Sequence, residues 1–153
     1  MSEVQTEFVM EMQLKVDLPL QPIGPAQYGD RRIAKVRGGT FEGPEIKGIV
    51  ADGGGDWILN RNDGVTQLDV RLVMETDDGA LIYMTYQGLR HGPEEVMAKL
   101  AAGEAVEADS YYFRTTPYFE TASEKYSWMN KSCFVGKGNR VPAGPVYRIF
   151  RVL

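Results

Sequence analysis

The chain contains one cysteine and one histidine among its 153 residues. Cys133 alone cannot form an intrachain disulfide, which is typical of proteins from a reducing compartment. His91 alone excludes metal sites built from several imidazoles, and a lone cysteine excludes a thiolate cluster. No spaced acidic loop resembles a calcium or magnesium site. The sequence therefore predicts a cytoplasmic protein and gives no reason to expect a resident metal.

An excess of basic residues and long apolar runs are also missing. The chain has 17 Lys and Arg against 21 Asp and Glu, a formal net charge of −4. Proteins that bind nucleic acid need a basic face to neutralise phosphates, so this partner class is not expected. No apolar run approaches the roughly 18 residues of a membrane span, and the N-terminus lacks the features of a signal peptide. We therefore expect neither nucleic acid nor membrane as a partner.

Nucleotide-binding fingerprints, phosphate loops and the Gly-x-Ser-x-Gly elbow of hydrolases are absent as well. Gly136-Lys137-Gly138 is the nearest approach to a phosphate loop, but it lacks the remaining motif residues. No cofactor is therefore expected.

Alternating polar and apolar residues dominate the rest of the chain. Period-two alternation predicts half-buried strands, and the clearest cover residues 7–16, 65–76 and 80–89. Asn62-Asp63-Gly64 and Asp77-Asp78-Gly79 are typical of hairpin turns. Further strands are predicted at 33–36, 45–51, 56–60, 110–116, 126–135 and 146–152, with loops or turns at 18–25 and 136–140, and one short helix between Pro93 and Gly103. This pattern predicts a single all-β domain over residues 1–153, a closed antiparallel β-barrel of about eight to ten strands.

The most informative stretch lies near the middle of the chain. Three glycines at 53–55 precede Asp56 and Trp57, a carboxylate and a large aromatic of the kind that line ligand pockets. In the strand that follows, Asp69 and Arg71 share one face about 6.6 Å apart and can pair. Leu68, Val70 and Leu72 occupy the other face. The polar face either lies in solvent or lines a site, and the residues alone leave both open.

Several motifs together resemble a known family, and they run in order along nearly the whole chain. They are Gly38-Gly39-Thr40-Phe41-Glu42-Gly43-Pro44, Gly53-Gly54-Gly55-Asp56-Trp57, Leu68-Asp69-Val70-Arg71, Asp78-Gly79-Ala80-Leu81-Ile82, Phe113 to Thr121 and Trp128-Met129-Asn130. The chain resembles the uncharacterised group called domain of unknown function 3237. The resemblance implies a closed barrel similar to those of allene oxide cyclase and dirigent proteins. Those relatives need no cofactor and bind small apolar or phenolic molecules, although fold alone does not assign a function.

These observations leave three functional hypotheses open. The first is a cofactor-free isomerase, cyclase or lyase, with Asp69 or Glu120 as the base and Arg71 stabilising a developing anion. The substrate-binding residues would be Asp56, Trp57, Tyr83, Phe113, Arg114, Trp128 and Asn130. The alternatives are a non-catalytic barrel that binds a small molecule and an interaction module with a filled interior. Exposed aromatic side chains would also permit a homo-oligomer.

Overall fold

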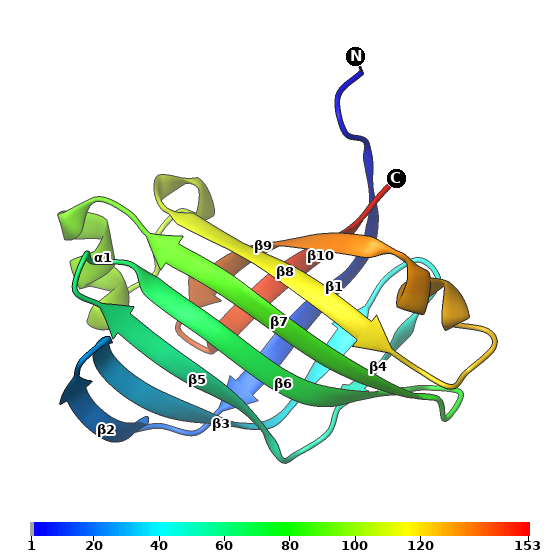
Figure 1. Cartoon of the computed structure of the whole chain (residues 1–153), viewed down its shortest axis with the longest axis horizontal. Helices are drawn as coiled ribbons and strands as arrows, with labels where there is room; N and C mark the ends of the chain where they lie inside the picture. The colour runs from blue at the N-terminus through cyan, green and yellow to red at the C-terminus, as the bar shows by residue number, and fades with distance from the viewer. Residues whose placement is uncertain (1) are drawn as a thin grey trace.

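The computed structural model describes residues 2–153, which form ten strands, one α-helix and two short 3-10 helices (Figure 1). The strands are β1 (Thr6–Val16), β2 (Gln21–Ala26), β3 (Gly29–Glu42), β4 (Lys47–Val50), β5 (Gly54–Arg61), β6 (Thr66–Thr76), β7 (Leu81–His91), β8 (Tyr112–Glu120), β9 (Cys133–Val141) and β10 (Gly144–Val152). The helices are α1 (Glu94–Ala101), η1 (Ala108–Ser110) and η2 (Ser127–Lys131). The predicted all-β class with one short α-helix is confirmed.

The strands close into an antiparallel barrel. Their order is β1-β10-β9-β8-β7-β6-β4-β3, and the ring closes because β3 also pairs with β1. β4 and β5 run in the same direction between β3 and β6, so together they fill one position of the ring. Consecutive antiparallel pairing from β6 to β10 completes the wall. The closed barrel predicted from the sequence is therefore present.

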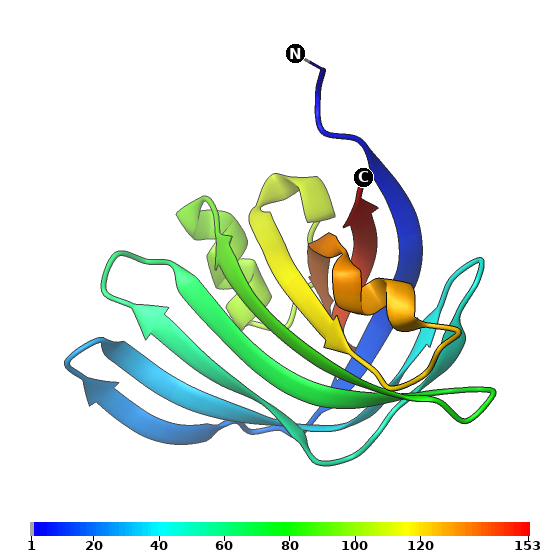
Figure 2. The ribbon, with the colours of Figure 1, turned by 45° about the vertical axis from the view of Figure 1, so that its right-hand side comes forward.

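One side of the barrel is left open at one end. β1 pairs with β3 up to Val16, and after the segment 17–20 the chain continues along β3 as β2. The pairing between β10 and β1 reaches only Gln13↔Val146, and β2 is the last strand of the sheet order. The segment 17–20 and the β9–β10 turn both line the cavity at this end of the barrel. Figure 2 shows β2, in blue, at this splayed end of the molecule.

The core fills the interior of the barrel with apolar side chains. In β6, Leu68, Val70 and Leu72 are buried, as the alternation predicts. Methionines from several strands join them, and Leu100 of α1 packs against the same cluster. Gly138 of β9 leaves room for the ring of Phe113, because a Cβ there would lie 2.7 Å from that ring. The core is therefore tightly packed along most of the barrel.

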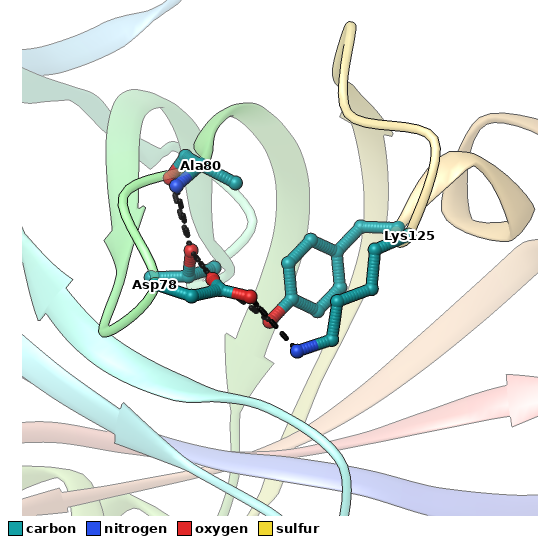
Figure 3. Close-up of polar contacts among 5 residues, drawn as sticks. Asp78, Ala80 and Lys125 are labelled. Carbon is teal, nitrogen blue, oxygen red and sulfur yellow. Dashed lines mark hydrogen bonds and ion pairs between the residues drawn. The ribbon is translucent and has the colours of Figure 1, made fainter.

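The opposite end of the barrel is held by a polar network (Figure 3). Asp78, in the β6–β7 turn, accepts hydrogen bonds from the Tyr126 hydroxyl at 3.1 and 3.2 Å and forms an ion pair with Lys125 at 2.8 Å. The Thr76 hydroxyl donates to Asp78 and accepts from the backbone N–H of Ala80. These contacts tie the turn to a segment almost 50 residues further along the chain.

Three of the local predictions are wrong. Residues 127–131 form the helix η2 instead of part of a strand, because the chain turns there to connect β8 and β9. The predicted turn at 136–140 lies inside β9, where Gly136 and Gly138 are close-packing positions rather than turn residues. The proline-rich segment after Leu18 contains β2, which tolerates its prolines because one of its edges is unpaired.

Candidate functional site

A cavity of about 100 Å³ opens at the splayed end of the barrel. An apolar cavity of about 150 Å³ can hold a benzene ring, so the smaller space here encloses only part of a small organic molecule, and the rest would extend through the mouth. Most of its wall is apolar and comes from β1, the 17–20 segment, β3, β5, β6 and the β9–β10 turn. The polar groups that face it are Asp56, Thr66, Tyr86, Arg90, Arg140 and Tyr147.

Asp56 places a carboxyl group in this apolar wall. It follows the glycine run, lies on the inward face of β5 and is only 8% exposed. Burial raises the pKa of Asp56 to about 6, although the hydrogen bond from Asp69 and the charge of Arg90 oppose the rise. A carboxyl group with such a pKa exchanges protons near neutral pH, as acid–base catalysis requires.

Two tyrosines form the floor of the cavity. Tyr86 of β7 and Tyr147 of β10 are both 2% exposed, and their rings meet edge-to-face with centroids 5.1 Å apart. Burial raises the pKa of both hydroxyl groups, and the neighbouring Asp56 raises both further. Both groups therefore stay protonated at neutral pH, and because the Tyr86 hydroxyl donates to that of Tyr147, the Tyr147 hydroxyl is left to donate to an oxygen of a bound molecule.

Two arginines complete the polar part of the site. Arg90 lies at the end of β7 with its guanidinium 5.4 Å above the ring of Phe113. Its Nε is buried and has no hydrogen-bond partner within residues 2–153. Arg140 lies at the end of β9, where its backbone N–H donates to the Tyr111 hydroxyl at 2.7 Å. Burial lowers the pKa of Arg90, and the positive charge of Arg140, which lines the same cavity, lowers it further.

The comparisons with known proteins identify the family. The family model described as "Protein of unknown function (DUF3237)" matches residues 4–152. The chain belongs to this family.

Proteins similar to this chain have a comparable length and the same fold. A UPF0311 protein of Clostridium acetobutylicum is 34% identical over 150 residues, 98% of this chain and 95% of that protein. The crystal structure of a conserved protein of unknown function from Rhodopseudomonas palustris superposes with a TM-score of 0.94 and 33% identity, over 100% of both chains. An enzyme from Penicillium herquei superposes with a TM-score of 0.75 over 99% of this chain and 96% of that one, but its 21% identity shows a common fold alone.

The three predicted catalytic residues of this DUF3237 protein lie outside the cavity. Asp69 and Arg71 point outward from β6 because Leu68 and Val70 occupy the inward face. The expected Asp69–Arg71 pair is not formed, since Arg71 donates to the Tyr83 hydroxyl at 3.0 Å. Glu120 is exposed at the end of β8.

Asp56 lines the cavity, whereas the other predicted substrate-binding residues lie elsewhere. Trp57 is 40% exposed on the outer face of β5, and Tyr83 is half-buried beside Arg71. Phe113 is fully buried beneath Arg90, and Arg114, on the outer face of β8, donates to a backbone carbonyl. The remaining two residues, Trp128 and Asn130, lie in η2, where the indole packs on Phe134 and the amide bonds to the backbone of Thr121.

Sequence reasoning missed Arg90, Arg140 and Tyr147. Arg90 lies an even number of residues after the inward-facing Ile82, Met84 and Tyr86. Extending the predicted strand 80–89 by one residue would therefore have placed Arg90 on the inward face. Arg140 lies on the same face of β9 as the inward-facing Phe134, but the glycines between them were interpreted as a turn. Tyr147 gave no signal that distinguished it from a core tyrosine.

Within residues 2–153, no three His, Cys, Asp or Glu side chains gather as they would around a metal ion. No helix in the described part of the chain is long and apolar enough to cross a membrane.

Proposed function

We propose that this DUF3237 protein is a cofactor-independent enzyme that moves a proton on a small, largely apolar molecule carrying a carbonyl group. The cavity at the splayed end of the barrel holds the substrate, and Asp56 is the general base and acid. The reaction class is an isomerisation, cyclisation or elimination of the kind that begins with removal of a proton next to an activating group. The observation that carries the proposal is the carboxyl group of Asp56, buried in an apolar cavity with a pKa of about 6.

The environment of Asp56 suits a base better than a structural carboxylate. A carboxylate with an ordinary pKa binds a proton too weakly to remove one from carbon, whereas a raised pKa strengthens it as a base. Its Oδ1 accepts the backbone N–H of Asp69 at 3.1 Å, which fixes its orientation. The second oxygen is left for the substrate.

The tyrosine pair supplies a hydrogen-bond donor for the substrate oxygen. When Asp56 takes a proton from the carbon next to a carbonyl, the bonding electrons move to the carbonyl oxygen. The hydroxyl of Tyr147 stabilises the resulting enolate by donating to that oxygen. Asp56 then returns the proton to a different carbon, which completes an isomerisation without any other reactant.

Exchange of carbon-bound hydrogen for deuterium tests this proposal without knowledge of the natural substrate. Cyclohexanone, acetophenone and levulinate are incubated in D₂O with the wild-type protein or Asp56→Asn, and proton NMR follows loss of the signal beside the carbonyl. The variant keeps an oxygen that can accept the Asp69 N–H, so it is expected to fold. We expect at least one ketone to exchange about 100-fold faster with the wild type.

Two results would overturn the proposal. If the wild type exchanges all three ketones no faster than Asp56→Asn, Asp56 is not a base for this chemistry. If a ketone raises the melting temperature of the wild type by mass action but does not exchange, the protein is a carrier or sensor.

A further inference from the structure

We propose that the ligand of the cavity is a monocarboxylate with a compact apolar body, whose carboxylate is held between Arg90 and Arg140. This inference names the substrate class of the site and rests on the proposed function for what happens to the molecule once bound. It arises from the charges at the mouth and from the division of the wall into polar and apolar parts.

The charges around the cavity are unbalanced. Arg90 and Arg140 face the cavity with two positive charges, and Asp56 supplies at most one negative charge. The ion pairs of residues 2–153 engage arginines at 32, 37, 61, 148 and 151, but neither of these two. Bringing two guanidiniums together at a partly buried site is unfavourable unless an anion lies between them.

The buried Nε of Arg90 points to the same conclusion. A buried donor without a partner is unfavourable, and such groups at a cavity are typically satisfied by a ligand or by water. The guanidinium is already positioned by its contact with the ring of Phe113. A carboxylate can accept two parallel hydrogen bonds from the fork of a guanidinium, which gives both strength and orientation.

The charge of Asp56 selects a monoanion over a dianion. With Asp56 ionised, the three groups carry a net charge of +1, which one carboxylate neutralises. A phosphate dianion would leave an excess negative charge in a cavity of low dielectric constant beside Asp56.

The apolar part of the cavity wall explains why the proposed ligand has an apolar body. Leu14, Val16, Leu18 and Leu20 come from β1 and the segment after it, and Ala34 and Val36 come from β3. None of these side chains offers a hydrogen bond, so this part of the wall favours hydrocarbon. A cavity of about 100 Å³ is smaller than one that encloses benzene, so it matches a short branched chain, or a single ring that extends into the mouth.

Isothermal titration calorimetry at pH 7.5 tests the proposal with benzoate, its neutral isostere benzamide and inorganic phosphate. The variants are Arg140→Gln and Asp56→Asn, with Arg114→Gln as a matched control because Arg114 lies on the outer face of β8. We expect benzoate to bind and the other two compounds not to. Loss of a charged hydrogen bond should weaken benzoate binding about tenfold or more in Arg140→Gln. Arg114→Gln should bind within about twofold of wild type, and Asp56→Asn should bind equally well or better because a neighbouring negative charge is gone.

Equal binding of benzamide or phosphate, or undiminished binding of benzoate to a folded Arg140→Gln, would overturn the carboxylate assignment. Failure of wild type to bind benzoate would do the same. The deuterium-exchange experiment distinguishes failure of the carboxylate assignment from failure of the proposed function. If cyclohexanone exchanges in an Asp56-dependent way but benzoate does not bind, the proposed enzyme activity stands and the carboxylate site is rejected. If benzoate binds but no ketone exchanges, the carboxylate site stands and the enzyme activity is rejected.

Discussion

The carboxyl group of Asp56 accepts a hydrogen bond from the backbone N–H of Asp69 at 3.1 Å. The register of β5 and β6 runs through Asp56↔Val70, is interrupted, and resumes at Leu59↔Gln67. The Asp56 side chain thus satisfies a backbone donor of β6 where the ladder is broken. The catalytic carboxyl group we propose is therefore held by the sheet itself, and Asp69 contributes its backbone while its side chain faces outward.

Ionising Asp56 should destabilise the fold. Its pKa is raised from 3.8 to about 6, so the folded state binds the proton more tightly than the unfolded state. Stability should therefore fall as the pH rises from about 4 to about 6, by on the order of 3 kcal/mol. Asp56→Asn should remove this pH dependence and be more stable than wild type at pH 8. Urea unfolding from pH 4 to pH 8 measures both, and identical pH profiles for the two proteins would contradict the burial of this carboxyl group.

Removing the outward pair on β6 should leave ligand binding unchanged. Asp69→Asn and Arg71→Ala alter side chains that do not line the cavity, and Arg71→Ala loses an exposed hydrogen bond to Tyr83. Each change should cost less than about 1 kcal/mol of stability. Calorimetry with benzoate should give affinities within about twofold of wild type. A tenfold loss of benzoate affinity in a variant that still folds would mean that the binding site lies on the outer face of the sheet.

The Asp78 network should stabilise the protein in a pH-dependent way. The hydrogen bond from Lys125, followed by that from Thr76, lowers the pKa of Asp78 from 3.8 to about 2. A lowered carboxyl pKa stabilises the fold above the unfolded-state value, and this contribution is lost as the pH falls through the folded-state value. Asp78→Asn should therefore melt well below wild type at pH 7 and close to it at pH 2.

Differential scanning calorimetry measures this difference, with Glu104→Gln as a control because Glu104 is exposed beyond the helix α1. A melting-temperature gap of the same size at pH 2 and pH 7 would mean that the charge of Asp78 does not hold the turn.

Gly138→Ala should disturb the support of the site. The new Cβ would lie 2.7 Å from the ring of Phe113, the ring on which the Arg90 guanidinium rests. Overpacking of this kind costs about 1–3 kcal/mol, and displacement of the ring should also weaken benzoate binding. Gly38→Ala is the matched control, since its Cβ would come no closer than 3.7 Å to another group. Equal unfolding free energies for the two variants would show that β9 and β8 are less closely packed than the structure has them.

Strand periodicity predicted the fold well, but Asp69, Arg71 and Glu120 lie outside the cavity that we propose as the site. Because side chains alternate along a strand, the inward direction of Leu68 and Val70 already implied that Asp69 points outward. Whether a residue of β6 faces the interior or the solvent thus depends on a shift of one position. Asp56 was selected for its residue type beside the glycine run, and its inward direction became visible only through the pairing of β5. Arg90 and Arg140 lie near the ends of strands, where prediction of boundaries is weakest. Their proximity depends on barrel closure, which brings together residues 50 positions apart and leaves no trace in local sequence.

A carbon-13 NMR titration of the Asp56 carboxyl group tests the central claim most directly. The protein is labelled at aspartate side-chain carbonyls, and the Asp56 signal is assigned by its absence from Asp56→Asn. We predict a midpoint near pH 6, as expected of a carboxyl group buried in the cavity wall. A midpoint at or below pH 4, the ordinary value for aspartate, would mean that the group is solvated and would contradict its role as a base.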